Sequence, residues 1–240
     1  MSYTIELGRL GNQIIRNIAV NLIAYKHNLC VQYCNISLIN SLGIQLYSGS
    51  NVYDNTIQLT DENFIEILNG DVLKSNVDTS SVFLQSREIT NMIYNWLNSP
   101  VIKHAIIETN PYIERYDINN DCFVHIRLTD VADHNPGLEY YLNILSQLSF
   151  DKLYIATDDY DHYIILSIMS MYPESYMVNR DEISTIQLGS TCKHVILSHG
   201  SFSAIIGYLS FFSTVYYPKY GEVLWYGDMF SIPGWNMVSY

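Results

Sequence analysis

The chain has 240 residues, a length that fits one large domain or two smaller ones. Hydrophobic residues make up 48% of it and charged residues 15%, a composition that can bury a core and excludes a disordered chain. The 24 acidic residues outnumber the 12 basic ones, and the net charge of -12 argues against nucleic acid as a partner, because phosphate backbones are bound by clustered Lys and Arg. A phosphorylated small molecule stays a candidate ligand, since it needs only one or two cations and some backbone N–H groups.

The sequence predicts a protein without disulfides, signal peptide or membrane anchor. Its four cysteines are scattered, and Cys30 and Cys34 have no second pair of ligands at zinc-site spacing, so we expect free thiols and no metal. The first residues lack a basic stretch followed by an apolar run, so we expect a cytoplasmic location. Residues 195–218 carry no Lys, Arg, Asp or Glu, but a polar break at residues 198–203 favours a strand, a turn and a buried helix over a membrane span.

The first half opens with a predicted strand at residues 3–7, a glycine turn, and a helix that ends near His27 with Asn28 at its C′ position. Apolar residues recur on one face of this helix at amphipathic spacing, at Ile15, Ile18, Ala19, Leu22 and Ile23. The opposite face is mostly polar, with Gln13, Arg16, Asn17 and Asn21 on it. Residues 35–85 are polar and irregular, and a helix is predicted at residues 88–97 with Pro100 after its end.

From residue 121 the pattern alternates between strands and helices. Strands are predicted at residues 122–127, 153–157, 176–178, 194–198 and 214–217. The first helix between them should begin at Asn135 as N-cap with Pro136 at its first position and continue through Leu148, while two others should end near residues 171 and 212. This alternation predicts a parallel sheet with helices on both faces. A polar segment at residues 110–120 divides the chain into halves at residues 1–115 and 116–240.

Three polar segments each follow a predicted strand of the second half. They are residues 127–130, residues 158–159 and residues 198–203. Because ligands bind outside the carboxyl ends of parallel strands, we expect these segments to converge on one edge of the sheet. The first half offers a fourth candidate, the turn Gly-Arg-Leu-Gly-Asn-Gln at residues 8–13, where glycine permits close approach of a ligand and a helix N-terminus follows. An ordinary strand-to-helix turn stays an open interpretation of that segment.

Each of these candidates has a functional and a structural interpretation. Arg127 can bind a phosphate through two N–H groups and stabilise a departing diphosphate, or it can be a paired Arg beside a buried His125. The carboxylate of Asp158 can accept two N–H groups of a guanine edge, or it can cap a helix. The serines and amides at residues 198–203 can form an anion site, or Ser can be a plain N-cap.

Together and in this order, these segments resemble motifs of the α-1,2-fucosyltransferase family. The turn at residues 8–13 resembles its glycine loop, and His-Ile-Arg-Leu-Thr-Asp at residues 125–130 is similar to the His-x-Arg-Arg-Gly/Thr-Asp motif of α-1,2- and α-1,6-fucosyltransferases. Leu-Tyr-Ile-Ala-Thr-Asp-Asp at residues 153–159 and Ser-His-Gly-Ser-Phe-Ser at residues 198–203 resemble the second and third motifs. Residues 227–235 resemble the Phe-x-Pro-x-Trp ending of the family.

The resemblance implies an α/β fold of GT-B type, in which two Rossmann-like halves with parallel sheets face a cleft. It implies an inverting transferase that moves fucose from GDP-fucose to a glycan hydroxyl without a metal, with residues 1–115 on the acceptor side and residues 116–240 binding the nucleotide sugar. The donor-binding residues it implies are Gly11, Asn12, Arg127, Asp158, Ser201, Phe202 and Ser203. The catalytic residues we expect are Arg127, His125 and Asp130, with Asp130, Asp133 and Glu139 as candidates for the base.

Leu128 departs from the motif, which often has a second Arg at this position, although protein O-fucosyltransferases have an apolar residue there. The lost charge leaves two alternatives open. One is a non-catalytic protein that binds a nucleotide sugar or a glycan, and the other is a transferase that uses a different donor sugar.

Overall fold

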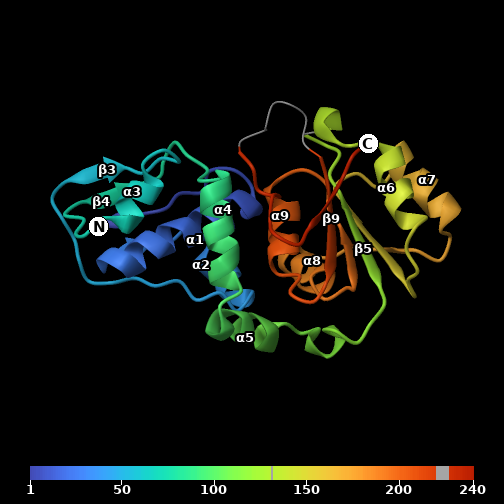
Figure 1. Ribbon diagram of the computed structural model, residues 1–240, viewed down its shortest axis with the longest axis horizontal. Coiled ribbons are helices and arrows are strands. Elements are labelled where there is room, and N and C mark those ends of the chain that lie inside the picture. Colours follow the sequence, from blue (N-terminus) through green and yellow to red (C-terminus); the bar gives the residue numbers. More distant parts are fainter. Residues whose placement is uncertain (131, 220–226) are drawn as a thin grey trace. The chain divides into compact units, whose positions relative to one another are not determined.

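The computed structural model describes residues 1–130, 132–219 and 227–240. These residues form two units, which are described separately (Figure 1). Within the described residues, the first unit comprises residues 1–106 and 227–231, and the second comprises residues 107–219 and 232–240. The sequence-based boundary, between residues 115 and 116, falls later in the chain than this division.

The first unit contains a parallel sheet of four short strands in the order β2-β1-β4-β3. The strands are β1 (Ser2–Tyr3), β2 (Val31–Gln32), β3 (Thr56–Gln58) and β4 (Asn76–Asp78). Its helices are α1 (Leu10–His27), α2 (Ile36–Ser41), α3 (Phe64–Asn69), α4 (Arg87–Leu97) and α5 (Pro100–Thr109), whose last residues belong to the second unit. The first strand is shorter than expected, because only Ser2 and Tyr3 pair with β2 and only Tyr3 pairs with β4.

Helix α1 is buried on almost every side, which corrects the expectation of a polar outer face. Arg16 is fully buried, and its guanidinium donates hydrogen bonds to the carbonyl oxygens of Ile5 (2.9 Å), Leu7 (3.0 Å) and Val82 (2.9 Å). The buried Asn17 amide donates to the carbonyl of Cys34 at 2.8 Å. These polar side chains satisfy the carbonyl groups of neighbouring loops, so their burial does not leave donors without acceptors.

The predicted helix at residues 88–97 is confirmed as α4, and Pro100 follows its end as expected. Pro100 also begins α5, a helix that pattern analysis missed. Proline is tolerated at the first helical position, because the N–H group that it lacks would have no partner there. Asn28, in contrast, ends α1 in the left-handed conformation (φ 54°), and its predicted position is confirmed.

The second unit contains a six-stranded parallel sheet in the order β10-β9-β8-β5-β6-β7. Its strands are β5 (Cys122–Ile126), β6 (Leu153–Thr157), β7 (Tyr176–Met177), β8 (His194–Ile196), β9 (Thr214–Pro218) and β10 (Asn236–Val238). Its helices are α6 (Leu138–Leu145), α7 (Tyr163–Met171), α8 (Glu182–Gly189) and α9 (Ser201–Tyr208), with short 3-10 turns at Ile113–Arg115 and Ala132–His134. The predicted α/β class, with a parallel sheet in each half, is confirmed.

Several boundaries in the second unit correct the sequence-based expectations. Helix α6 begins after Gly137 rather than after Asn135, because Gly137 has φ of 84° and the Asn135 side chain accepts a hydrogen bond from its N–H instead of capping a helix. It ends at Leu145, so Leu148 lies outside it. Helix α8 and strand β10 were not predicted. Residues 195–218 divide among β8, α9 and β9, and none of the described helices is long and apolar enough to cross a membrane.

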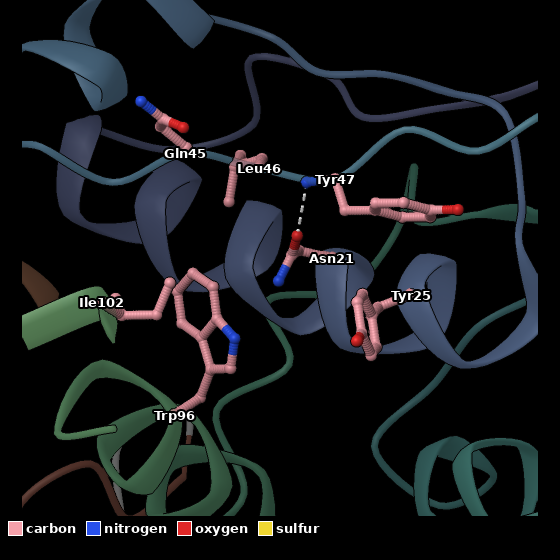
Figure 2. Close-up of a pocket in the computed structure, with 7 residues that line it drawn as sticks. All are labelled: Asn21, Tyr25, Gln45, Leu46, Tyr47, Trp96 and Ile102. Atoms are coloured by element: carbon pink, nitrogen blue, oxygen red, sulfur yellow. Dashed lines mark hydrogen bonds between the residues drawn. The ribbon is translucent and has the colours of Figure 1, made fainter. Parts of the chain in front are cut away.

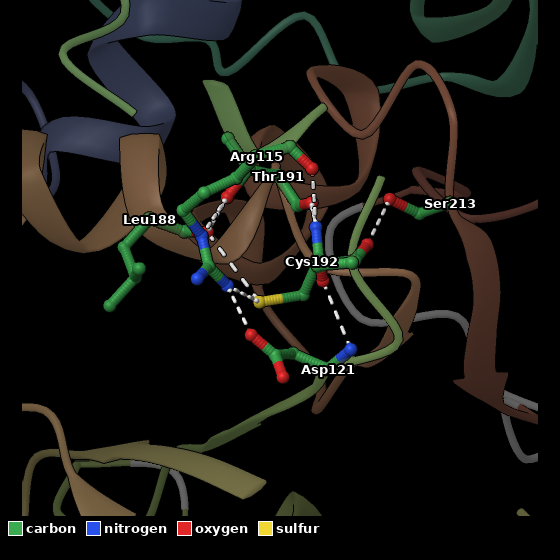
Figure 3. A network of polar contacts seen from close by, with 7 residues as sticks. Arg115, Asp121, Leu188, Thr191, Cys192 and Ser213 are labelled. Carbon is green, nitrogen blue, oxygen red and sulfur yellow. Dashed lines mark hydrogen bonds and ion pairs between the residues drawn. The ribbon is translucent and has the colours of Figure 1, made fainter. Parts of the chain in front are cut away.

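A polar network fixes the amino-terminal edge of this sheet (Figure 3). Nη2 of Arg115 donates to Asp121 Oδ2 at 2.8 Å and lies 3.4 Å from Cys192 Sγ, while its Nε donates to Thr191 Oγ1 at 3.0 Å. Asp121 is the residue before β5, and its carboxylate is buried. Burial also raises the pKa of the Cys192 thiol to about 12, which keeps it protonated. The contacts at this edge are therefore buried and structural, whereas the candidate site lies at the other end of β5.

Candidate active site

The three polar segments of the second half lie at adjacent strand ends. Strand β5 has β8 on one side and β6 on the other, and all three run parallel. The segments at residues 127–130, 158–159 and 198–203 follow these strands at their carboxyl ends, where parallel α/β sheets bind ligands. The order of the strands thus brings together the segments that the sequence identified.

Arg127 follows the last residue of β5 and forms a bidentate ion pair with Asp130. Nε and Nη2 donate to Asp130 Oδ1 at 3.1 and 3.0 Å, and Nη2 donates to Oδ2 at 2.8 Å. The Arg127 side chain is only 11% exposed, whereas that of Asp130 is 45% exposed. Within the described residues, Nη1 of Arg127 has no hydrogen-bond partner. Asp130 therefore fixes the edge of the guanidinium that carries Nε and Nη2, and the N–H groups of Nη1 are available to a ligand.

The free edge of Arg127 lies against the start of α9. A Cβ atom built on Gly200 would lie 2.9 Å from Nη1 of Arg127, so a larger residue would displace the guanidinium. Gly200 also has φ of 102°, a conformation that L side chains rarely adopt. It precedes Ser201, the first residue of α9, and no side chain caps this helix. The N–H groups of the first turn and Nη1 together provide several donors and a positive field.

Asp158, which follows β6, binds the loop that carries Arg127. Its Oδ1 accepts from the backbone N–H of Leu128 at 2.7 Å and of Thr129 at 3.3 Å, and its Oδ2 accepts from the Thr129 hydroxyl at 2.6 Å. Partial burial raises the pKa of Asp158, but the hydrogen bonds from Thr129 and Leu128 outweigh this effect and lower it. The alternative interpretation of Asp158 as a helix cap does not hold for α7, which begins at Tyr163 with His162 as its cap.

His125 points into the protein from β5. Its Nδ1 lies 2.5 Å from the hydroxyl of Ser203, and its ring packs at 5.2 Å between centroids against Phe202. Burial lowers the pKa of His125 to about 4, with Arg127 adding to the decrease and Asp158 opposing it. The imidazole is therefore neutral at pH 7 and ties β5 to the first turn of α9.

A second layer of polar side chains holds the backbone of these segments. The Asn135 amide donates to the carbonyl of Arg127 at 3.0 Å, and the Tyr140 hydroxyl donates to the carbonyl of Leu197 at 2.9 Å. Sequence reasoning missed both roles. Asn135 was interpreted as a helix cap because it precedes a proline, and Tyr140 has no sequence signal that separates it from an ordinary core aromatic.

Leu128 is buried in the hydrophobic core of the second unit. Its side chain lies among those of β5, β6, α6 and α7, so the position that often carries an Arg in the resembled motif is here part of the core. Arg127 is thus the cation that this strand end provides at residues 127–130.

Two predicted donor-binding residues belong to the first unit. Gly11 is buried in the first turn of α1, and Asn12 Oδ1 accepts a hydrogen bond from Gln85 Nε2 at 2.8 Å. A Cβ atom on Gly8 (φ 76°) would collide with the Asn12 side chain, so the glycine turn and Asn12 are fitted to each other. The units are described separately, and the roles of these two residues toward a ligand stay predictions.

Carboxylates near the site are exposed, and none of the described residues forms a metal-binding cluster. Asp133 lies in a 3-10 turn and Glu139 in the first turn of α6, both exposed. Groups of three or more His, Cys, Asp or Glu that could hold a metal ion are absent from the described residues.

No protein-family model matches the sequence, and no curated protein does. Among solved structures, the chain is similar to POFUT1 in complex with GDP-fucose, at 14% identity and a TM-score of 0.36 over 58% of this chain and 51% of that chain. It is also similar to POFUT1 in complex with GDP, at 11% identity and a TM-score of 0.46 over 85% of this chain and 92% of that chain. The first of these matches spans about half of the other chain.

Proposed function

We propose that the protein is an inverting glycosyltransferase of GT-B type that moves L-fucose from GDP-fucose to a glycan hydroxyl, in α-1,2 linkage. The observation that carries the proposal is the position of Nη1 of Arg127 beside Gly200, 2.9 Å from where a Cβ atom of that residue would lie, at the uncapped start of α9. A guanidinium edge and the N–H groups of a helix start are the donors that a diphosphate requires. The order of the motifs supports fucose and guanosine as the other parts of the donor.

In this mechanism the diphosphate of the donor binds Nη1 of Arg127 and the backbone N–H groups of residues 201–203. As the bond to the anomeric carbon breaks, that carbon gains positive charge and the diphosphate gains negative charge. The donors then bind the leaving group more strongly than the intact donor substrate, and this difference lowers the barrier. The acceptor hydroxyl attacks from the opposite face of the sugar and loses its proton to a base.

His125 and Asp130 act through their neighbours in this proposal. His125 is neutral and bonded to Ser203, so it orients the start of α9 rather than transferring a proton. Asp130 orients Arg127, because both of its oxygens already accept from the guanidinium. Asp133 and Glu139 are exposed, and among the described residues neither is hydrogen-bonded to Arg127. They are therefore stronger candidates for the base than Asp130.

Asp158 serves the donor site in two ways. It fixes the loop that carries Arg127, and its exposed carboxylate accepts from the N–H groups of a guanine edge when the donor is bound. The glycine turn adds Gly11 and Asn12 to the proposed donor-binding residues. We propose that none of these steps needs a metal ion.

The non-catalytic alternative also has an observation in its favour. Leu128 occupies a core position where related motifs often supply a second cation, and a site with one Arg provides less stabilisation for a leaving diphosphate. A protein that binds GDP-fucose without turnover would use the same contacts. Turnover measurements therefore decide between the two functions, and binding measurements alone do not.

The test pairs a thermal-shift panel with a transfer assay. Ligands that bind the native state raise the melting temperature, so GDP and GDP-fucose should raise it while UDP does not, with GDP-mannose as the control for the sugar. Release of GDP from GDP-fucose in the presence of galactose-terminated oligosaccharides should follow, and digestion with a linkage-specific fucosidase identifies the bond. Binding without GDP release would favour the non-catalytic protein, and a preference for UDP would contradict both functions.

A further inference from the structure

A pocket of about 330 Å³ lies in the first unit (Figure 2). It is lined by the second half of α1, the segment at residues 45–47, the end of α4 and the start of α5. Asn21 on its wall is nine residues beyond Asn12, which corresponds to about 14 Å along a helix. The pocket and the glycine turn therefore occupy opposite ends of α1.

Aromatic rings and amide groups form most of the pocket. Tyr25, Tyr47 and Trp96 contribute the rings, and the two tyrosines pack edge to face at 5.4 Å between centroids. The side chain of Tyr25 is 74% exposed, so burial of its ring contributes little to the stability of the unit. Asn21 and Gln45 contribute the amides.

Two N–H donors point into this space. The side chain of Asn21 is buried, and its Oδ1 accepts from the backbone N–H of Tyr47 at 2.7 Å, which fixes the orientation of the amide. Figure 2 shows Nδ2 of Asn21 and Nε1 of Trp96 directed toward the interior between Trp96 and Tyr25. Within residues 1–130, 132–219 and 227–240, neither nitrogen has a hydrogen-bond partner. The fixed amide therefore presents Nδ2 to the pocket in one orientation, in which an acceptor of a ligand can bind it.

The chemistry of the lining selects the class of ligand. None of the seven described residues that line the pocket carries a charge, so a neutral ligand fits better than an ion. Aromatic faces pack against apolar C–H surfaces, and amides both donate to and accept from hydroxyl groups. A pyranose ring combines these two features, because its C–H face is apolar and its rim carries hydroxyls. A volume of about 330 Å³ lies at the small end of ligand sites and suits one or two sugar rings.

We propose that this pocket is a saccharide-binding site for a neutral hexopyranose unit of an oligosaccharide, formed by residues other than those of the proposed donor site. The sugar stacks on Tyr25 and Trp96, and its ring or hydroxyl oxygens accept from Nδ2 of Asn21 and Nε1 of Trp96. The pocket binds the saccharide without GDP and without Arg127, so it does not depend on the proposed function.

Ligand-observed NMR with three neutral disaccharides, N-acetyllactosamine, lactose and maltose, tests the proposal on the full chain. At least one should give saturation transfer, and Tyr25→Ala should weaken its affinity at least fivefold while Tyr163→Ala, at a similarly exposed tyrosine on α7, leaves it unchanged. Trp96→Phe keeps a ring and removes the N–H donor, so it should weaken binding less than Trp96→Ala. Arg127→Ala should bind the disaccharide like the wild type, which separates this site from the donor site.

Three results would overturn the proposal. The first is the absence of saturation transfer from all three disaccharides to the folded wild-type protein. The second is a signal that Tyr25→Ala and Tyr163→Ala reduce equally. The third is binding of an oligoproline peptide that depends on Tyr25 and Trp96 when no disaccharide does, because that pattern would identify a peptide site.

Discussion

The two ends of strand β5 carry the same kind of ion pair with different surroundings. At the amino end, Arg115 and Asp121 approach to 2.8 Å, the carboxylate is 6% exposed, and Thr191 and Cys192 complete the contacts of the guanidinium. At the carboxyl end, Arg127 and Asp130 also approach to 2.8 Å, but Asp130 is 45% exposed and Nη1 lies against Gly200. The Arg115–Asp121 pair is enclosed by protein side chains, whereas Arg127 of the second pair keeps N–H donors that a ligand can bind. The surroundings of an Arg–Asp pair therefore indicate whether the pair has a structural role or binds a ligand. The distance between its nitrogen and oxygen atoms does not.

The largest expected effect is on turnover when Arg127 is changed. Arg127→Ala should lower transfer by about 100-fold or more, as loss of one oxyanion donor does in other enzymes. Arg127→Lys should fail almost as badly, because an ammonium cannot bond Asp130 and the diphosphate with a planar fork. Both variants should melt close to the wild type, since the partner left behind is exposed. Turnover and melting temperature are measured on the same preparations. A stable Arg127→Ala protein with wild-type turnover would contradict the proposed mechanism.

The matched change at the other end of β5 should have the opposite pattern. Arg115→Ala leaves a buried carboxylate without its cation, which costs about 2–3 kcal/mol given the partial exposure of the guanidinium. For a chain of this length that corresponds to a decrease of roughly 5–10 °C in melting temperature. The affinity of the folded protein for GDP should stay within about twofold of the wild type. Calorimetry and a GDP titration below the lower melting temperature check both parts, and a loss of GDP affinity without destabilisation would reverse the assignment of the two pairs.

Acidification should destabilise the protein through His125. Its pKa is about 4 in the folded protein and about 6.5 when unfolded, so the unfolded chain binds more protons between these values and stability falls as pH decreases through that window. The contribution is about 3 kcal/mol and is fully present only above about pH 6.5. Burial lowers the pKa of His199 to about 4 as well and also lowers the pKa of His194, so three histidines contribute.

His125→Gln should flatten this pH dependence, while His104→Gln, at an exposed position on α5, should leave it as in the wild type. Denaturant unfolding at about pH 7 and about pH 5 gives the two free energies. Equal slopes for all three proteins would show that His125 is not the group that titrates.

A smaller effect is expected from Asp158. Asp158→Ala removes three hydrogen bonds from the loop at residues 128–129, and the exposure of the carboxylate limits the cost to about 1 kcal/mol, or roughly 2–4 °C. GDP affinity should fall about tenfold because the loop positions Arg127. Thr129→Val removes the hydroxyl contact alone and should give a smaller decrease. Unchanged GDP affinity in Asp158→Ala would exclude both the guanine contact and the positioning role.

The smallest expected effect is that of metal removal. Transfer should keep its rate after treatment with EDTA, because the proposed stabilisation of the diphosphate comes from Arg127 and backbone N–H groups. A rate that disappears with EDTA and returns with manganese would contradict this prediction.

The sequence predicted the central strands and the convergence of three segments, because alternating periodicity and polar strand ends are local signals. It did not predict the buried polar side of α1, where Arg16 and Asn17 satisfy carbonyls of loops that are distant in sequence. Asn135 shows the same limit, since its Asn-Pro pair is a sound local signal for a helix cap, yet the amide binds the carbonyl of Arg127. The pairing of Arg127 with Asp130 is local, because the two residues are three apart in one loop. The proximity of Arg127 to Gly200 depends instead on β8 lying beside β5, which no local pattern encodes.

The most direct test of the diphosphate site compares GDP with guanosine by isothermal titration calorimetry, using the wild type and Arg127→Ala. Guanosine lacks the two phosphates, so the ratio of the two affinities measures the diphosphate contribution without the guanine contact. We expect GDP to bind the wild type at least about 100-fold more tightly than guanosine, as the loss of charge-assisted hydrogen bonds implies. In Arg127→Ala this ratio should fall to less than about tenfold, with guanosine affinity unchanged. The same ratio in both proteins would contradict the account, because the diphosphate would then be bound without Arg127.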